Sequence, residues 1–271
     1  PTRRSSDLAV LDGVCDITLV GEAGKIAELC GRFGLDRGLF QVEDVSDPAA
    51  AGRRAVELVR SGQAQVLMKG LIGTETYMRC ILDKERGLLA PGALLTHVTV
   101  FEVATYPKLL FGGDVAIVPA PDLGQKSKIL QVLAAAAPRF GIETPKAALL
   151  AASEKVSERM PATMDAALLA KMAERGQIPG VLVDGPLALD VALFPEAAAT
   201  KGVRSPVAGD ADILLFPNIE AGNIFYKAIT GLARGRLAAV VAGASAPCVL
   251  TSRADDEECK FLSIVLGCML G

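Results

Sequence analysis

The chain has 271 residues, of which 51% are hydrophobic, and a formal net charge of −3. This length is sufficient for one large core or for two medium α/β lobes. The slight acidity argues against a general nucleic-acid binder, which would carry a basic patch, and no apolar run reaches the roughly 18 residues of a membrane span.

The first eight residues, PTRRSSDL, differ in character from the rest of the chain. The string TRRSSDL is also what a common sequencing adapter yields when it is translated. We therefore interpret residues 1–8 as an artefact joined to a truncated gene, leave them out of the expected fold, and expect the native N-terminus to be missing.

The cysteine pattern bears on the compartment. The six cysteines form no CxxC pair and have no histidine near them in the sequence. A zinc site or a redox motif is therefore not expected. No signal-peptide pattern is visible, so reduced thiols in a cytoplasmic protein are the expectation.

Short β-rich runs alternate with helical patterns along most of the chain. This alternation is typical of crossover units and mostly parallel sheets, and so of an α/β fold. The expected strands lie at 16–21, 64–70, 147–153, 180–186, 211–217, 237–243 and 248–252.

The segment 94–119 breaks this alternation. Its two extended runs join at Tyr106-Pro107 with no room for a helix between them, so an antiparallel pair is expected. A long helical pattern follows at roughly 122–139, and this helix is a candidate bridge between two lobes.

Two apparent motifs have plainer interpretations. The segment VGEAGKIAEL (20–29) resembles a phosphate-binding loop, but Leu19 and Ile26 stand where the motif needs a glycine and a hydroxyl. An ordinary strand-to-helix turn is expected there. His97, the only histidine, lies in an alternating strand, where a structural role is commoner than a catalytic one, and no GxSxG elbow supports a Ser-His-Asp relay.

Polar residues cluster after three expected strands, where ligands bind in a doubly wound sheet. After the first, Lys69 and Gly70 precede a helix that carries Thr74 and Arg79. After the second, a turn is expected before a helix, and the residues of interest there are Asn218, Glu220, Gly222 and Asn223.

The third strand end has the sequence PCVLTSRADDEECKF (247–261). Thr251 or Ser252 could simply cap a helix, with the acidic residues 255–258 complementing its dipole. Arg253 is harder to explain, because a cation beside a helix N-terminus is unfavourable unless an anion lies between them. The residues alone thus indicate an α/β enzyme with a site for a phosphate-like anion.

At these residues the sequence resembles the phosphate acetyltransferase and phosphate butyryltransferase family. The resemblance runs from about residue 64 to the C-terminus. The sequences DGPLALD, RGQI and LTSRAD are closer to the butyryl branch than to the acetyl branch. The matching strings are LMKGLIGTETYMR, APDLGQKSKI, MDAALLAKMAERGQI, VDGPLALDVAL, SPVAGDADILLFPNIEAGNIFYKA and VLTSRAD.

The resemblance implies a two-lobed α/β fold like that of the isocitrate and isopropylmalate dehydrogenases, with parallel and mixed sheets, helices on both faces and an active cleft between the lobes. We expect one lobe from 9–122 plus 243–271 and a second from 123–242. The resemblance also implies a homodimer or a higher homo-oligomer, with no nucleic-acid or membrane partner.

The implied reaction is the reversible conversion of acyl-CoA and phosphate into acyl phosphate and coenzyme A, which is a substrate; neither a metal nor another cofactor is implied. Ser252 would stabilise the sulfur or the leaving oxygen, and Arg253 would hold phosphate and polarise the acyl carbonyl. Arg79 matches a second arginine of the phosphate site. The other expected substrate-binding residues are Lys69, Gly70, Thr74, Glu220, Gly222 and Asn223.

The general base departs from the family pattern. The acetyl enzymes carry an aspartate seven residues after the serine, and here that position is Cys259. Glu258 stands one residue earlier, about 100° away on a helix. Two alternatives stay open: Glu258 serves as the base, or no base exists and the thiolate forms in solution.

Three other functions compete with a phosphate butyryltransferase. A phosphate acetyltransferase is the nearest, and a non-catalytic protein that binds coenzyme A or acyl phosphate is the second. A decarboxylating dehydrogenase would need clustered aspartates for Mg²⁺, whereas Asp184 and Asp190 are isolated. The sequence does not define the acyl chain length, the physiological direction or the oligomer size.

Overall fold

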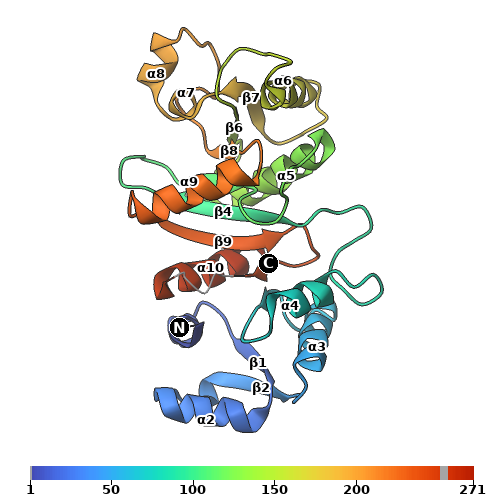
Figure 1. Ribbon diagram of the computed structural model, residues 1–271. Coiled ribbons are helices and arrows are strands. Elements are labelled where there is room, and N and C mark those ends of the chain that lie inside the picture. Colours follow the sequence, from blue (N-terminus) through green and yellow to red (C-terminus); the bar gives the residue numbers. More distant parts are fainter. Residues whose placement is uncertain (1, 251–255) are drawn as a thin grey trace. The chain divides into compact units, whose positions relative to one another are not determined.

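The computed structural model describes residues 2–250 and 256–271 (Figure 1). The chain divides into two compact units, one formed by residues 1–93 with 238–271 and the other by residues 94–237. The expected lobes differ from these units in two ranges: 94–122 was expected in the first lobe and 238–242 in the second. The lobe assignment stays a prediction.

The first unit contains two small groups of strands, one parallel and one mixed. Strands β1 and β2 pair in parallel from Ile17↔Phe40 to Gly21↔Asp44, and β10 pairs in parallel with β3 and antiparallel with β9. Strand β2 was not expected. The elements of this unit are α1 (Thr2–Leu11), β1 (Ile17–Gly21), α2 (Ala23–Phe33), β2 (Phe40–Asp44), α3 (Pro48–Arg60), β3 (Leu67–Met68), α4 (Thr74–Ile81), β9 (Arg236–Ala242), β10 (Cys248–Val249) and α10 (Glu257–Leu270).

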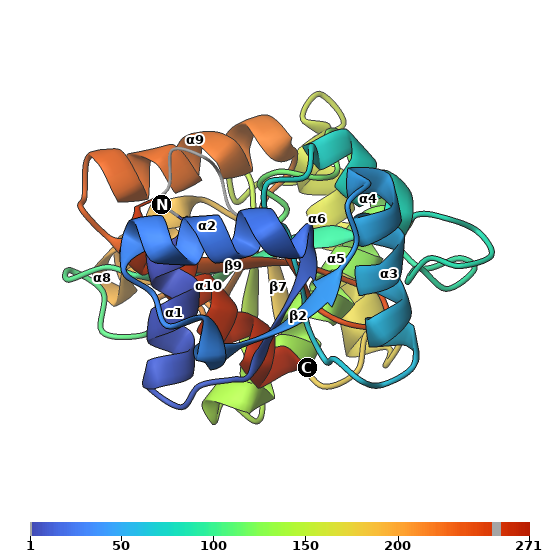
Figure 2. The ribbon, with the colours of Figure 1, turned by 90° about the horizontal axis from the view of Figure 1, so that it is seen from below.

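The two ends of the chain meet in this unit, where helices α1 and α10 lie side by side (Figure 2). Ser5 is buried, and its hydroxyl donates a hydrogen bond to the Glu257 carbonyl at 3.1 Å. Residues left out of the expected fold therefore form part of a packed helix. Asp7 is also buried, and its Oδ1 has no hydrogen-bond partner among the described residues. The interpretation of 1–8 as an artefact stays a prediction.

The second unit contains five neighbouring strands of a mixed eight-stranded sheet, together with helices. Its strand order is β4-β5-β8-β6-β7, and only β4 and β5 pair antiparallel, which confirms the antiparallel pair expected in 94–119. The elements are β4 (Thr96–Glu102), β5 (Leu110–Gly113), α5 (Leu123–Ala136), β6 (Lys146–Leu150), α6 (Pro161–Glu174), β7 (Leu182–Leu187), α7 (Leu189–Leu193), α8 (Pro195–Thr200), β8 (Ile213–Leu215) and α9 (Ile219–Gly231).

Two consecutive glycines at the end of β5 allow packing on both faces of this sheet. A Cβ on Gly112 would lie 2.8 Å from the Phe101 ring, and a Cβ on Gly113 would lie 3.2 Å from the Leu133 side chain of α5. Successive strand residues point to opposite faces. Helix α5 therefore covers one face, and the aromatic cluster of Phe101 with Phe225 of α9 covers the other.

Helix α5 begins at a complete capping box. The Asp122 carboxylate accepts from the Gln125 N–H at 2.8 Å, and the Gln125 side chain accepts from the Asp122 N–H at 2.9 Å. The helix packs on β4, β5 and β8 through residues such as Ile129 and Leu133. The expected helix at 122–139 is thus confirmed, and its role as a bridge between lobes stays a prediction.

Candidate active site

Two of the three expected ligand-binding strand ends lie next to each other in the first unit. Strands β3 and β10 are parallel neighbours, and the Lys69 N–H donates to the Val249 carbonyl at 3.0 Å. Their carboxyl ends therefore share one edge, with Lys69 and Gly70 following β3 and Leu250 following β10. Ser252 and Arg253, the expected catalytic pair, come just after Leu250 in the sequence but lie outside the described residues.

Helix α4 brings two more candidate residues to the same strand-turn-helix segment. Gly73 is its N-cap and Thr74 its first residue, in an exposed position. Arg79 points outward and forms an ion pair with Glu75, with 2.6 Å between Nη2 and Oε1 and 74% of the arginine side chain exposed. An exposed pair of this kind is worth about 0–1 kcal/mol, so an anionic ligand can displace it.

The start of α10 corrects the expected helix cap. The N-cap is Asp256, whose Oδ1 accepts from the Cys259 N–H at 2.8 Å, rather than Thr251 or Ser252. An aspartate side chain is among the best acceptors for the unpaired N–H groups of a first turn. Glu257 and Glu258 occupy that first turn and complement the helix dipole.

Glu258 and Cys259 face different surroundings on this turn. They are consecutive residues of α10, so their side chains diverge by about 100°. Glu258 is exposed, whereas Cys259 is half-buried. Glu258 therefore does not take the direction of position 259, where the acetyl enzymes carry the aspartate, and whether Glu258 is the base stays open.

The expected turn around residue 220 is wrong, because the segment is already helical. Asn218 is the N-cap of α9, and its side chain accepts from the Ala221 N–H at 3.0 Å. Glu220, Gly222 and Asn223 therefore lie in the first turns of a helix. The helix is already capped at Asn218, four residues before the glycine that suggested a turn.

Gly222 and Asn223 have clear roles inside the second unit. A Cβ on Gly222 would lie 2.4 Å from the Asp114 carbonyl oxygen, so only glycine lets α9 approach this backbone. The Asn223 side-chain amide donates to the Val115 carbonyl at 3.2 Å. Both residues hold α9 against residues 114–115, while Glu220 remains exposed on the first turn.

Asp114 is a buried polar residue that sequence analysis did not single out. Its Oδ2 accepts from the Thr96 hydroxyl at 2.8 Å and from the His97 N–H at 2.9 Å, and its Oδ1 accepts from the N–H groups of Ala116 and Ile117. Four donors thus satisfy a carboxylate that fixes the turn after β5. His97 is buried, with Nδ1 3.0 Å from Thr99 Oγ1, which accords with a structural role.

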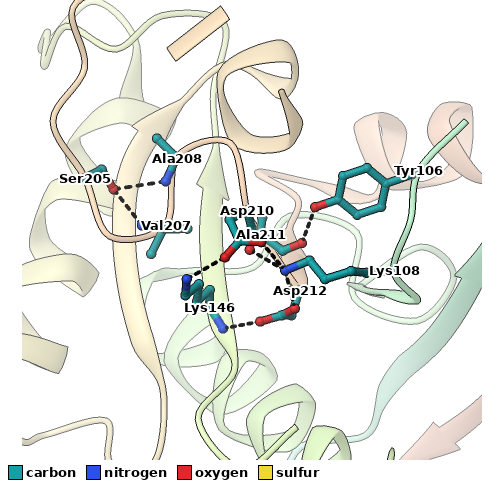
Figure 3. Close-up of polar contacts among 9 residues, drawn as sticks. All are labelled: Tyr106, Lys108, Lys146, Ser205, Val207, Ala208, Asp210, Ala211 and Asp212. Carbon is teal, nitrogen blue, oxygen red and sulfur yellow. Dashed lines mark hydrogen bonds and ion pairs between the residues drawn. The ribbon is translucent and has the colours of Figure 1, made fainter. Parts of the chain in front are cut away.

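A charged cluster of two lysines and two aspartates lies at the amino ends of strands of the second unit (Figure 3). Lys108 Nζ lies 2.6 Å from Asp210 Oδ1 and 2.8 Å from Asp212 Oδ1, and Lys146 Nζ lies 2.5 Å from Asp210 Oδ2. Hydrogen bonds from Lys108 and Lys146 lower the pKa of Asp210 below its ordinary value. The cluster lies at the amino ends of β6 and β8, away from the edge where ligands bind, and its charges are mutually paired.

The string SPVAGDAD, which contributed to the family resemblance, leads into this cluster. The Ser205 hydroxyl accepts from the N–H groups of Val207 and Ala208, which folds a local turn (Figure 3). Gly209 has a φ of +79°, and its Cβ would lie 2.7 Å from the Pro195 Cα. The string therefore contributes a turn and a close backbone contact to the scaffold of the second unit.

Across residues 2–250 and 256–271, no group of three His, Cys, Asp or Glu side chains could hold a metal ion. Within the same residues, no helix has the length and apolar character required to cross a membrane.

Comparison with known sequences gives one consistent result. The family model described as phosphate acetyl/butaryl transferase matches residues 23–268. A phosphate butyryltransferase from Clostridium acetobutylicum is 45% identical over 259 residues, covering 96% of this chain and 86% of the relative. A phosphate acetyltransferase from Thermotoga maritima is 44% identical over 254 residues, covering 94% and 86%.

Solved structures agree with the sequences and with the expected fold. A branched-chain phosphotransacylase from Enterococcus faecalis V583 superposes with a TM-score of 0.80 at 31% identity, covering 94% of this chain and 98% of that one. A putative 4-hydroxythreonine-4-phosphate dehydrogenase from Salmonella typhimurium gives a TM-score of 0.58 at 15% identity, over 99% and 94%. The second likeness concerns the fold alone and confirms that the α/β fold is dehydrogenase-like.

Proposed function

Because the chain belongs to the phosphate acetyl/butaryl transferase family, we propose that it converts butyryl-CoA and phosphate into butyryl phosphate and coenzyme A, and the reverse. Phosphate acyltransferase activity is common to its relatives. The single observation that supports the butyryl group is the 45% identity to a phosphate butyryltransferase along almost the whole chain.

An acetyl group is the second candidate, because a phosphate acetyltransferase is 44% identical over a similar length. One methylene in an apolar pocket changes specificity by only about 1–3 kcal/mol. The choice between acetyl and butyryl therefore depends on a few pocket residues and has to be measured.

The proposed chemistry uses the cationic residues that follow β3 and β10 in the sequence. In the direction of acyl-CoA synthesis, the thiolate of coenzyme A attacks the carbonyl carbon of the acyl phosphate, the carbon–sulfur bond forms, and phosphate leaves with the electrons of the carbon–oxygen bond. Arg253 and Arg79 would hold the phosphate and Ser252 the developing charge. Preorganised electrostatics of this kind usually contribute most to such catalysis.

Lys69, Gly70 and Thr74 complete the proposed phosphate side of the site. Lys69 and Gly70 follow β3, and Thr74 opens α4 four residues after Gly70, where helix N–H groups and the helix dipole favour an anion. Glu220 is the exposed candidate of the second unit. Gly222 and Asn223 would contribute to binding indirectly, through the placement of α9.

The remaining parts of the proposal concern partners and compartment. The substrates are acyl-CoA, phosphate and acyl phosphate, with coenzyme A as a substrate rather than a resident cofactor, and no metal is required. We further propose that the protein forms a homodimer or a higher homo-oligomer. We also propose a cytoplasmic location, which fits the free cysteines.

The test is release of free thiol from butyryl-CoA by the purified protein, measured with and without phosphate. We expect release only with phosphate, unchanged by EDTA, and faster with butyryl-CoA than with acetyl-CoA or propionyl-CoA. Release without phosphate would indicate a thioesterase and contradict the proposal. Binding of coenzyme A without any turnover would instead indicate a non-catalytic homologue.

A further inference from the structure

Tyr77 is a buried residue on α4 that the proposed reaction does not use. It is 3% exposed, and Ile81, one turn later, is 0% exposed. Arg79 lies two positions from Tyr77, about 200° around the helix, and points outward. The depth and rotation of Tyr77 therefore determine the direction in which α4 presents Arg79.

The Tyr77 hydroxyl links the two strands that end at the proposed site. It donates to the Leu67 carbonyl of β3 at 3.0 Å and lies 3.4 Å from the Val249 carbonyl of β10. The Cys248 side chain also contacts it through a hydrogen bond. One oxygen thus joins α4 to the first residue of β3 and to the last residue of β10.

The positions of these contacts in the chain matter for phosphate binding. Leu67 lies two residues before Lys69, and Val249 lies four residues before Arg253. Burial, and then the neighbouring Cys248, raises the pKa of the Tyr77 hydroxyl above its ordinary value. The group therefore remains a neutral donor throughout the pH range in which the enzyme would work.

We propose that Tyr77 is a positioning residue, whose hydroxyl links the backbones of β3 and β10 and sets the rotation of α4, so that Lys69 and Arg79 are held where phosphate binds. This inference rests on the proposed function. It assigns Tyr77 no contact with the substrate. A shift of about 1 Å in a positioned group can cost about 100-fold in rate, so one buried hydrogen bond is sufficient to matter.

The test compares Tyr77→Phe with Tyr106→Phe. Each substitution removes one hydroxyl that donates to a backbone carbonyl, and the Tyr106 hydroxyl donates to Ala211 at 2.7 Å in the second unit, beside the charged cluster. Ile81→Val serves as a second control, because it trims the same buried face of α4 and keeps the Tyr77 hydroxyl. Thermal stability, kcat and the KM values for phosphate and butyryl-CoA are measured for each.

We expect Tyr77→Phe to lower kcat/KM for phosphate by about 10- to 100-fold, mostly through a raised KM, while both controls stay within about twofold of wild type. Unchanged kinetics in Tyr77→Phe would overturn the proposal. An equal loss in Tyr106→Phe or Ile81→Val would also overturn it, because the effect would then follow stability. A Tyr77→Phe protein that does not fold would assign the hydroxyl to stability alone and overturn it too. A wild-type protein without phosphate-dependent turnover would instead contradict the proposed function.

Discussion

Arg253 is expected to contribute shape as well as charge at the phosphate site. A guanidinium offers a planar fork for two phosphate oxygens, whereas an ammonium is a point charge. We expect Arg253→Lys to lower kcat/KM by about 10-fold or more, which is about 1.4 kcal/mol on the barrier. Arg79→Ala should mainly raise the KM for phosphate. Steady-state kinetics check both, and wild-type behaviour of both variants would place the anion site elsewhere.

The thiol of coenzyme A has to lose its proton without an aspartate at position 259. Glu258 is exposed and turned about 100° from Cys259, so we expect no direct proton transfer to Glu258. Glu258→Gln should then stay near wild type, and the rate with coenzyme A should rise with pH towards the thiol pKa of about 8.5.

The kinetics of Glu258→Gln and Cys259→Asp distinguish proton transfer to Glu258 from thiolate formation in solution. A loss of about 100- to 10,000-fold in Glu258→Gln, with folding and coenzyme A binding intact, would identify Glu258 as the base and contradict our expectation. Acceleration in Cys259→Asp would show that position 259 faces the thiol. Circular dichroism provides the folding control.

The packing of α9 against residues 114–115 can be tested at Gly222 by measuring stability, independently of catalytic activity. A methyl group at this position would lie 2.4 Å from a backbone oxygen, which has no side-chain freedom to move away. We expect Gly222→Ala to lower the free energy of unfolding by about 1–3 kcal/mol. Gly231→Ala, on the same helix with open space around it, is the matched control and should be neutral or slightly stabilising. Equal stability of the two variants in urea would contradict the close approach.

At the scale of whole elements, the charged cluster of Lys108, Lys146, Asp210 and Asp212 links β6 and β8 to the segment before β5. Asp210 has a lowered pKa in the folded state, so its stabilising contribution is present above the ordinary carboxyl value of 3.8 and is lost as the pH falls through the folded pKa. We expect Asp210→Asn to cost about 1 kcal/mol at pH 7, since 52% of the side chain is exposed, and progressively less below pH 3.8.

Chemical denaturation between pH 2.5 and pH 7 measures this difference. Glu174→Gln removes a single exposed ion pair with Lys171 on α6, and we expect it to cost less than Asp210→Asn at pH 7. A cost of Asp210→Asn that stays constant down to pH 2.5 would show that the carboxylate charge is not what stabilises the cluster.

Local sequence patterns predicted most elements but not those that depend on distant contacts. Each expected strand overlaps an observed one, because β-branched runs and flanking turns are local signals. Strand β2, Phe40–Asp44, was missed because alternating polar residues and partial burial give it a weak pattern. The glycine at 222 suggested a turn, yet it is helical and required by the distant Asp114 carbonyl.

In the candidate site, too, residues grouped by local sequence could be predicted, whereas those brought together by distant contacts could not. Lys69, Thr74 and Arg79 could be grouped from sequence because they belong to one strand-turn-helix segment. Tyr77 could not be singled out, because the second carbonyl that its hydroxyl contacts lies 172 residues later in the chain. Only the folded pairing of β3 with β10 brings these groups together.

At the scale of the whole molecule, the two units differ in how the chain builds them. The second is one continuous segment, 94–237, which contains the neighbouring strands β4, β5, β8, β6 and β7. The first needs both chain ends, because Leu67 and Lys69 of the β3 segment donate to Pro247 and Val249, and α1 packs against α10. Continuous segments with their own core can fold independently, whereas a segment without its strand partner leaves backbone groups unpaired.

We therefore expect the fragment 94–237 to fold alone and the fragment 1–93 to remain unfolded. Circular dichroism should show a cooperative thermal transition for 94–237 and none for 1–93, because the latter lacks β10 and α10. Adding a peptide of residues 238–271 to 1–93 should induce helical signal in proportion to its binding, since the partner strand and helix are then supplied in trans. Cooperative melting of 1–93 by itself would contradict this assignment, as would a 94–237 fragment that shows no transition.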